Sequence, residues 1–191
     1  MNSLQMVADF HHAFSHPVAE QPQPLDTPLA KLRVGLITEE RDELLQAVKD
    51  NNLVGVVDAV QDLKYVVIGA ALALGADLDT SPLYEGEAVI SDEDRASDLE
   101  YLNECVEELV EAAAGLDFIA FQTSLADIYY AAMLVSAQFR FDDDAHFNVV
   151  HLANMRKLGA DGKPIYREDG KVLKPEGWTG PEADHERLLA A

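Results

Sequence analysis

Five carboxylates occupy two neighbouring stretches of the chain at spacings that gather side chains on one side of a helix. Glu39, Glu40 and Glu43 stand in LITEERDELLQAV, and Asp58 and Asp62 stand in the largely apolar VVDAVQDLKYVVIGAALAL. Residues three and four apart share a helix face. Acidic groups on an apolar face repel one another and lose hydration, which is tolerated only when a cation pairs with them. An all-oxygen set favours Mg²⁺ or Mn²⁺.

These five residues, called the acidic set below, have the donors for a two-metal site. They are sufficient to hold two or more hard divalent ions, with water completing the coordination. Two ions about 3.5–4 Å apart can stabilise the attacking and leaving oxygens of a phosphoryl transfer, and a glutamate left over can take a proton from the attacking water. The alternative is a solvated acidic helix face. That alternative is the stronger one for the glutamates alone, but it does not explain two aspartates inside an apolar helix.

The composition indicates a folded and very acidic protein. Apolar residues make up 48% of the 191 residues, and 35 acidic against 14 basic residues give a formal charge of −21. This balance argues against binding nucleic acid or an anionic membrane through a broad basic surface. A small anionic substrate remains compatible with it, because a metal ion supplies positive charge locally. Cys105 is the one cysteine, so no disulfide can form within the chain.

No targeting or membrane segment is expected. The N-terminal MNSLQMVADFHHAFSHP lacks a basic region followed by a continuous apolar core. The longest apolar run, near residues 65–74, is too short to span a bilayer and follows Asp62 and Lys64. We therefore expect a cytoplasmic protein of a bacterial or phage-infected cell.

The hydrophobic periodicity predicts an all-α fold, a single domain over residues 1–191 built as a bundle of about five helices. A short amphipathic helix over residues 7–15 precedes a proline-rich segment, and Asp26 or Thr27 can cap the first long helix. Residues 160–191 form a mostly irregular strap with a small hairpin around Asp169-Gly170. The long helices are expected at residues 28–49, 53–75, 92–114, 118–139 and 142–159.

The acidic pattern recurs later in the chain. The glutamate spacing is repeated at Glu107, Glu108 and Glu111, and Asp127 corresponds to Asp62, whereas Thr123 falls where Asp58 would be. We interpret residues 1–79 as a first helical unit with the metal site and residues 92–159 as a second, degenerate copy. Chance similarity between two acidic amphipathic helices is the alternative.

Candidate substrate contacts lie in the last quarter of the chain. Asn154 and Lys157 share a polar helix stripe with His151, which is better explained as structural. The strap has a basic excess, of which Lys171 and Lys174 are candidates for phosphate contact, while Tyr166 and Trp178 are expected to pack on the bundle. Glu182 and His185 have the Glu-x-x-His spacing of di-iron bundles, but one such pair in a tail does not make that site.

Several segments together resemble a known family. The first set of these segments is EERDE, a turn and an aspartate pair leading into DLKYVVIGAAL. The second set is FHHAFSHPV, RVGLITEE and NMRKLGADGKPIYREDGKVLKPEGWTGP. In both sets the chain resembles the all-α NTP pyrophosphohydrolases of the MazG-like superfamily. That superfamily includes phosphoribosyl-ATP pyrophosphohydrolases and dimeric dUTPases. The resemblance covers residues 7–75 and 145–181 well and residues 80–140 poorly. Glu39, Glu40, Glu43 and Asp62 fall on the family's acidic motif; Ala59 stands where the family has a further Glu, and Asp58 precedes it.

The resemblance implies hydrolysis of a nucleoside triphosphate between the α and β phosphates by metal-activated water, in a homodimer or homotetramer. One of the three glutamates would double as general base. A phosphoribosyl-ATP or dUTP pyrophosphohydrolase of the same fold is an alternative. Another alternative, from a different class, is a non-enzymatic acidic protein that mimics nucleic acid, although a mimic needs carboxylates spread outward.

Overall fold

A computed structural model of the protein describes residues 2–81, 91–159, 161–168 and 170–191. The described residues are predominantly helical and contain no strand, which confirms the all-α prediction. Seven helices are found in them: α1 (Ser3–Ala13), α2 (Thr27–Lys49), α3 (Leu53–Leu74), α4 (Asp92–Gly115), α5 (Phe118–Phe139), α6 (Asp143–Met155) and α7 (Glu182–Leu189).

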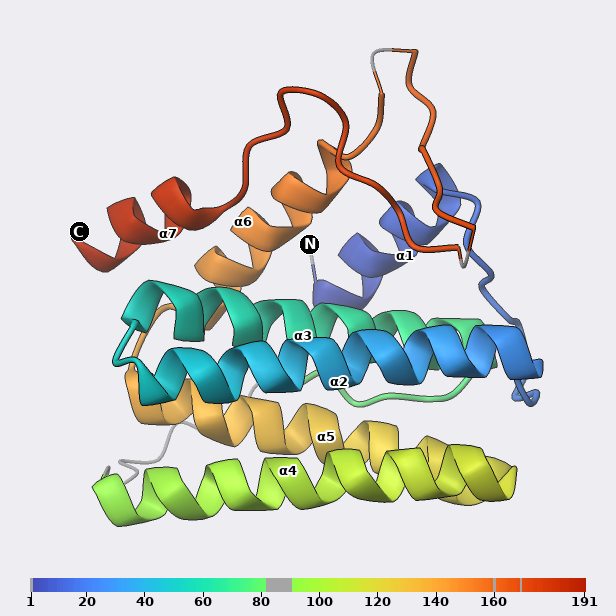
Figure 1. The fold of residues 1–191 in the computed structure, drawn as a ribbon, viewed down its shortest axis with the longest axis horizontal. Coiled ribbons are helices and arrows are strands. Elements are labelled where there is room, and N and C mark those ends of the chain that lie inside the picture. Colours follow the sequence, from blue (N-terminus) through green and yellow to red (C-terminus); the bar gives the residue numbers. More distant parts are fainter. Residues whose placement is uncertain (1, 82–90, 160, 169) are drawn as a thin grey trace.

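The helices are arranged in three layers with α3 near the middle (Figure 1). α2 pairs with α3, α4 pairs with α5, and the two pairs pack against each other through α3–α5 and α2–α4 contacts. α1, α6 and α7 cover the opposite side of α3. This central position explains why α3 is apolar on several sides, with Leu63, Val67 and Ile68 fully buried.

Capping residues set the helix boundaries largely where the sequence predicts them. The Asp26 carboxylate accepts from the Leu29 N–H at 2.8 Å, so Asp26 is the cap of α2. Gly75 ends α3 with a positive φ of 66°, a conformation that glycine adopts without steric cost. Ser91 caps α4 through the Asp94 N–H. α1 differs from the prediction, because Asn2 caps it and it begins at Ser3 rather than at Val7.

α5 is long and apolar enough, by length and composition, to cross a membrane. A bundle core requires a helix of the same kind, and α5 packs against both α3 and α4. Ile128, Ala132 and Val135 on α5 are fully buried there. Burial within the bundle therefore accounts for the apolar character of this helix.

The strap crosses the layer formed by α1, α6 and α7. α6 ends at Met155, before the expected Gly159, and antiparallel bridges then join Leu158 to Pro164 and Tyr166 to Val172. The second bridge flanks the predicted hairpin turn, of which Asp169 lies outside the described residues. The strap ends in α7, a helix that the sequence analysis did not foresee because it is short and mostly polar.

Candidate active site

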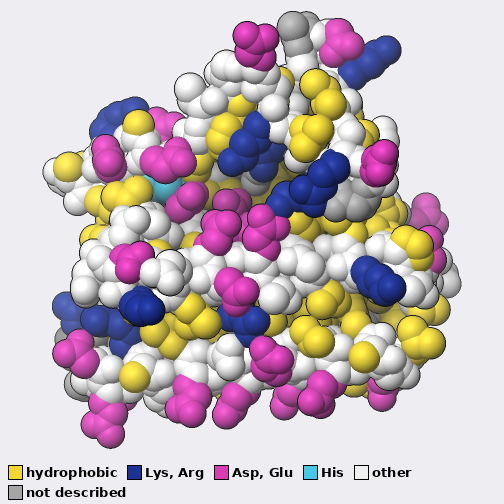
Figure 2. Space-filling model, viewed as in Figure 1, with side chains coloured by type: hydrophobic (Ala, Val, Ile, Leu, Met, Phe, Trp, Pro, Cys, Tyr) yellow, Lys and Arg dark blue, Asp and Glu magenta, His cyan; other side chains and the backbone are white. Residues whose placement is uncertain are grey.

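A cleft of about 300 Å³ lies between α2 and α3 on one side and α6, the strap and the start of α7 on the other. Figure 2 shows this face, on which basic side chains of the strap stand across a hollow from acidic side chains over α2. All nine residues that the sequence singled out line the cleft: Glu39, Glu40, Glu43, Asp58, Asp62, Asn154, Lys157, Lys171 and Lys174.

The acidic set is assembled by two antiparallel helices. α2 contributes the three glutamates and α3 contributes the two aspartates, each at the spacing that places it on the facing side of its helix. Burial, then Asp62 and the neighbouring glutamates, raise the pKa of Glu40 to about 9. Burial and Asp58 raise the pKa of Asp62 to about 7. Both shifts favour the protonated acids. If every member of the cluster were ionised, it would hold more negative charge than its surroundings stabilise.

Three lysines face the acidic set: Lys157 just after the end of α6, and Lys171 and Lys174 on the strap. Lys171 donates to Glu39 Oε1 at 2.7 Å, which fastens the hairpin to α2. Lys157 donates to Asn154 Oδ1 at 2.6 Å, and burial lowers its pKa. The Lys174 ammonium stands 4.2 Å from the centre of the Trp178 ring. The cleft thus has an acidic wall and a basic wall, as a site for a metal-bound phosphate chain requires.

The aromatic residues of the strap pack on the bundle. The Trp178 indole N–H donates to the Ala153 carbonyl at 3.0 Å, and the Tyr166 hydroxyl donates to the Phe14 carbonyl. Trp178 also lines the cleft. His151 lies beside the Tyr65 ring with its Nδ1 3.1 Å from the Tyr65 hydroxyl, a structural contact outside the cleft lining.

Asp58 is held by a histidine that the sequence analysis left out of the site. His185 on α7 is fully buried, and its Nε2 lies 3.3 Å from Asp58 Oδ1. A carboxylate only accepts, so Nε2 is the donor, and in the neutral ring Nδ1 then accepts from His146 Nδ1 at 2.8 Å. The Glu182-x-x-His185 spacing was the one signal in the sequence, and both of its members reach the site: Glu182 lines the cleft.

The donor set fits a hard divalent cation by type and charge. Carboxylate oxygens are the ligands that Mg²⁺ and Mn²⁺ prefer, and a cation would relieve the repulsion that raises the pKa values of Glu40 and Asp62. As the side chains stand in the part of the chain that the structure describes, no three acidic or histidine residues are close enough to share one ion. Glu39, for example, is turned toward Lys171. Metal binding would therefore require side chains of the set to rotate.

The second acidic group does not assemble in the same way. Glu107, Glu108 and Glu111 are exposed on α4 and none of them lines the cleft. Glu107 instead accepts from Arg41 at 3.0 Å, an arginine that is mostly buried between α2 and α4. The two helical pairs are consistent with the repeat, which stays a prediction.

The far end of the cleft, toward α1, contains further polar residues that the sequence analysis missed. Arg33 and His11 are almost fully buried there, and His16 is partly buried. Their spacing in the sequence forms no recognisable motif, so only the packing of α1 on α3 reveals them.

Comparison with known proteins finds a family match over the part of the chain that carries the acidic set. Residues 7–81 match the family model described as phosphoribosyl-ATP pyrophosphohydrolase, a segment that contains the whole acidic set. The chain is 28% identical over 183 residues to an uncharacterized protein of Acanthamoeba polyphaga mimivirus, covering 82% of this chain and 71% of the relative. No solved structure matches the chain. Residues 7–81 therefore form a phosphoribosyl-ATP pyrophosphohydrolase family domain, of the MazG-like superfamily of all-α NTP pyrophosphohydrolases.

Proposed function

We propose that the protein hydrolyses a nucleoside or deoxynucleoside triphosphate between the α and β phosphates, releasing the monophosphate and pyrophosphate, with Mg²⁺ or Mn²⁺. The family domain supports a pyrophosphohydrolase activity on nucleotides. The observation that carries the finer proposal is the convergence of five carboxylates and three lysines on one cleft. The cations of a metal-bound triphosphate need the carboxylates as ligands, and its phosphate oxygens need the lysines as donors.

The acidic set would hold two or more cations. When bound, these ions would supply the positive charge that phosphoryl transfer needs and favour deprotonation of the attacking water. Within the set, a glutamate that is not used as a ligand, among Glu39, Glu40 and Glu43, accepts the proton of that water.

The basic wall binds the phosphate chain. Lys157, Lys171 and Lys174 can each donate to phosphate oxygens, and Asn154 positions Lys157 through their hydrogen bond. Lys171 is bonded to Glu39, so binding of cations by Glu39 would break this bond and allow Lys171 to donate to the substrate.

A non-enzymatic nucleic-acid mimic is not favoured by this geometry. A mimic presents its carboxylates outward to a basic partner, whereas the acidic set faces a cleft and two of its members have raised pKa values. Phosphoribosyl-ATP contains the same triphosphate group as a nucleoside triphosphate, so it should be tested as a substrate beside the nucleotides. Assembly as a homodimer or homotetramer remains an expectation from the family resemblance.

The direct test is incubation of the purified protein with single nucleotides and Mg²⁺ or Mn²⁺. We expect metal-dependent release of pyrophosphate, inhibition by a chelator, and a rise in Tm with either metal because the ions bind the folded state. Absence of pyrophosphate from every nucleotide, together with an unchanged Tm in the presence of metal, would contradict the proposal.

A further inference from the structure

Arg33 is a buried cation at the end of the cleft that faces α1. Its side chain is 4% exposed and lines the cleft, and burial lowers its pKa to about 10. Within the described residues its guanidinium makes no ion pair or hydrogen bond, and its Nε is buried without a partner. An arginine kept in this state lacks the acceptors that its five N–H donors require.

Two histidines of the N-terminal segment complete this end of the cleft. His11 Nδ1 donates to the Pro17 carbonyl at 2.9 Å, and burial lowers the pKa of His11 to about 3. The ring is therefore neutral, and its Nε2 is left as an acceptor. His16 Nδ1 is buried without a partner, which makes it the second unsatisfied polar atom at this end.

A glycine on α3 allows the His11 and Arg33 side chains to lie close to each other and to the helix backbone. A Cβ atom at Gly69 on α3 would lie 2.8 Å from His11 Nε2 and 3.2 Å from Arg33 Nη1. An acceptor and a donor thus lie side by side over Gly69. The rings of Phe10, His16 and Tyr65 line the same end of the cleft, and they offer apolar faces to a flat ligand.

The distance from the acidic set suits the base of a nucleotide. Arg33 precedes Glu40 by seven positions on α2, and Gly69 follows Asp62 by seven on antiparallel α3. Seven residues are two helical turns, about 10 Å along each axis. The ribose spans such a gap between the α-phosphate and the base. The three lysines lie at the acidic end, where the Trp178 ring also lines the cleft beside Lys174, whereas Phe10, His16 and Tyr65 lie toward Arg33.

We propose that Arg33, His11 and Gly69 form the base subsite of the enzyme, and that it selects keto bases (guanine, hypoxanthine, uracil or thymine) over adenine and cytosine. The proposal rests on the pyrophosphohydrolase function above. A keto base presents a carbonyl oxygen beside a ring N–H. The carbonyl accepts from the donor-only Arg33, and the ring N–H donates to His11 Nε2. Adenine and cytosine present an amino donor in place of the carbonyl, so Arg33 would face another donor.

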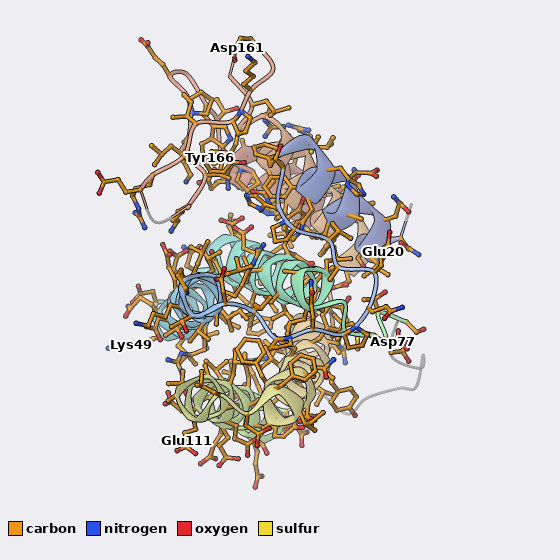
Figure 3. All side chains as sticks on the ribbon, turned by 90° about the vertical axis from the view of Figure 1, so that its right-hand side faces the viewer. Glu20, Lys49, Asp77, Glu111, Asp161 and Tyr166 are labelled. Carbon is orange, nitrogen blue, oxygen red and sulfur yellow. The ribbon has the colours of Figure 1, made fainter. Side chains whose placement is uncertain are left out.

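The strap holds the histidine segment in place over this subsite. Tyr166 lies beside α1 in Figure 3, where its hydroxyl donates to the Phe14 carbonyl and its ring lies 6.0 Å from that of His16. The same hairpin bears Lys171 at the acidic end. The hairpin therefore contacts both the acidic end of the cleft and the segment that carries His16.

The test compares kcat/KM for dITP with dATP and for dUTP with dCTP, each pair differing at one ring position in carbonyl against amino group. We expect the wild-type protein to favour the keto member by about tenfold or more. Equal rates for both members, with pyrophosphate released from each, would overturn the base subsite and leave the proposed function intact. No release from any nucleotide would instead refute the function itself.

Two variants test whether the preference for keto bases arises at this base subsite. Arg33→Lys keeps the charge but loses the guanidinium fork, and Gly69→Ala adds a methyl group from another helix that would displace His11 and Arg33. Both should reduce the keto-to-amino ratio toward one, with Tm measured to confirm folding. Arg41→Lys is the matched control, a buried arginine of the same helix that faces α4, and it should keep the ratio. An unchanged ratio in folded Arg33→Lys and Gly69→Ala would contradict the proposal.

Discussion

His185 Nε2 donates to Asp58 Oδ1 at 3.3 Å and thereby links the last helix of the chain to the acidic set. The two residues are 127 positions apart, and His146 supports His185 from the other side of the ring. Asp58 stands one position before Ala59, where the family that the sequence resembles has a glutamate. A histidine bond that fixes its shorter side chain is a physical reason why an aspartate can serve there.

His185→Gln is expected to weaken metal binding. Loss of a group that orients a ligand costs about 10–100-fold in metal affinity, so the Mn²⁺ concentration for half-maximal rate should rise while kcat at saturating Mn²⁺ changes less. Arg187→Gln, on the exposed side of the same helix, is the control. An unchanged Mn²⁺ dependence in folded His185→Gln would show that Asp58 needs no such support.

Lys171→Gln is expected to raise the KM for the nucleotide. A hydrogen bond to a charged group contributes about 1.5–3 kcal/mol, so loss of the phosphate contact should raise KM by about tenfold or more. Lys163→Gln, exposed in the same strap and outside the cleft lining, should keep the wild-type KM. If both variants had wild-type KM values, the strap would not contact the phosphates.

The neutral His11 predicts a stability difference at low pH. Its folded-state pKa is about 3, against about 6.5 in the unfolded chain. Above pH 6.5 neither state binds the proton; below it only the unfolded state does, so stability is lost as pH falls. Relative to His11→Asn, which can keep the bond to the Pro17 carbonyl, the wild type should lose about 1.4 kcal/mol per pH unit between pH 6 and 4.

Urea unfolding at each pH measures this difference, and comparison with the variant cancels the opposite contribution of the acidic set. The carboxylates with raised pKa values gain stability as pH falls, but they do so equally in both proteins. His12→Asn, on the exposed face of the same helix, should follow the wild type. If the free energy of unfolding depended on pH in the same way in the wild type and in His11→Asn, the neutral state of His11 would be contradicted.

The acidic set was predictable because its members are local in sequence. Helical spacing and an apolar context identify Asp58 and Asp62 without knowledge of any tertiary contact. The lysines required the family resemblance in addition. Arg33 and His185 were not predictable, because an arginine in KLRVG looks like an ordinary exposed helix residue and a histidine in ADHERLL looks like part of a solvated tail. Their burial follows from packing between segments far apart in the chain.

The central claim is that the first acidic set, and not the second, cleaves a nucleoside triphosphate at the α–β bond. The most direct measurement is ³¹P NMR of the products formed with Mg²⁺ by the wild type and by four variants. The wild type, Glu111→Ala and Asp127→Ala should yield the monophosphate and pyrophosphate in equal amounts, whereas Glu43→Ala and Asp62→Ala should yield neither. Nucleoside diphosphate with inorganic phosphate, or equal loss of turnover in all four variants, would contradict the account.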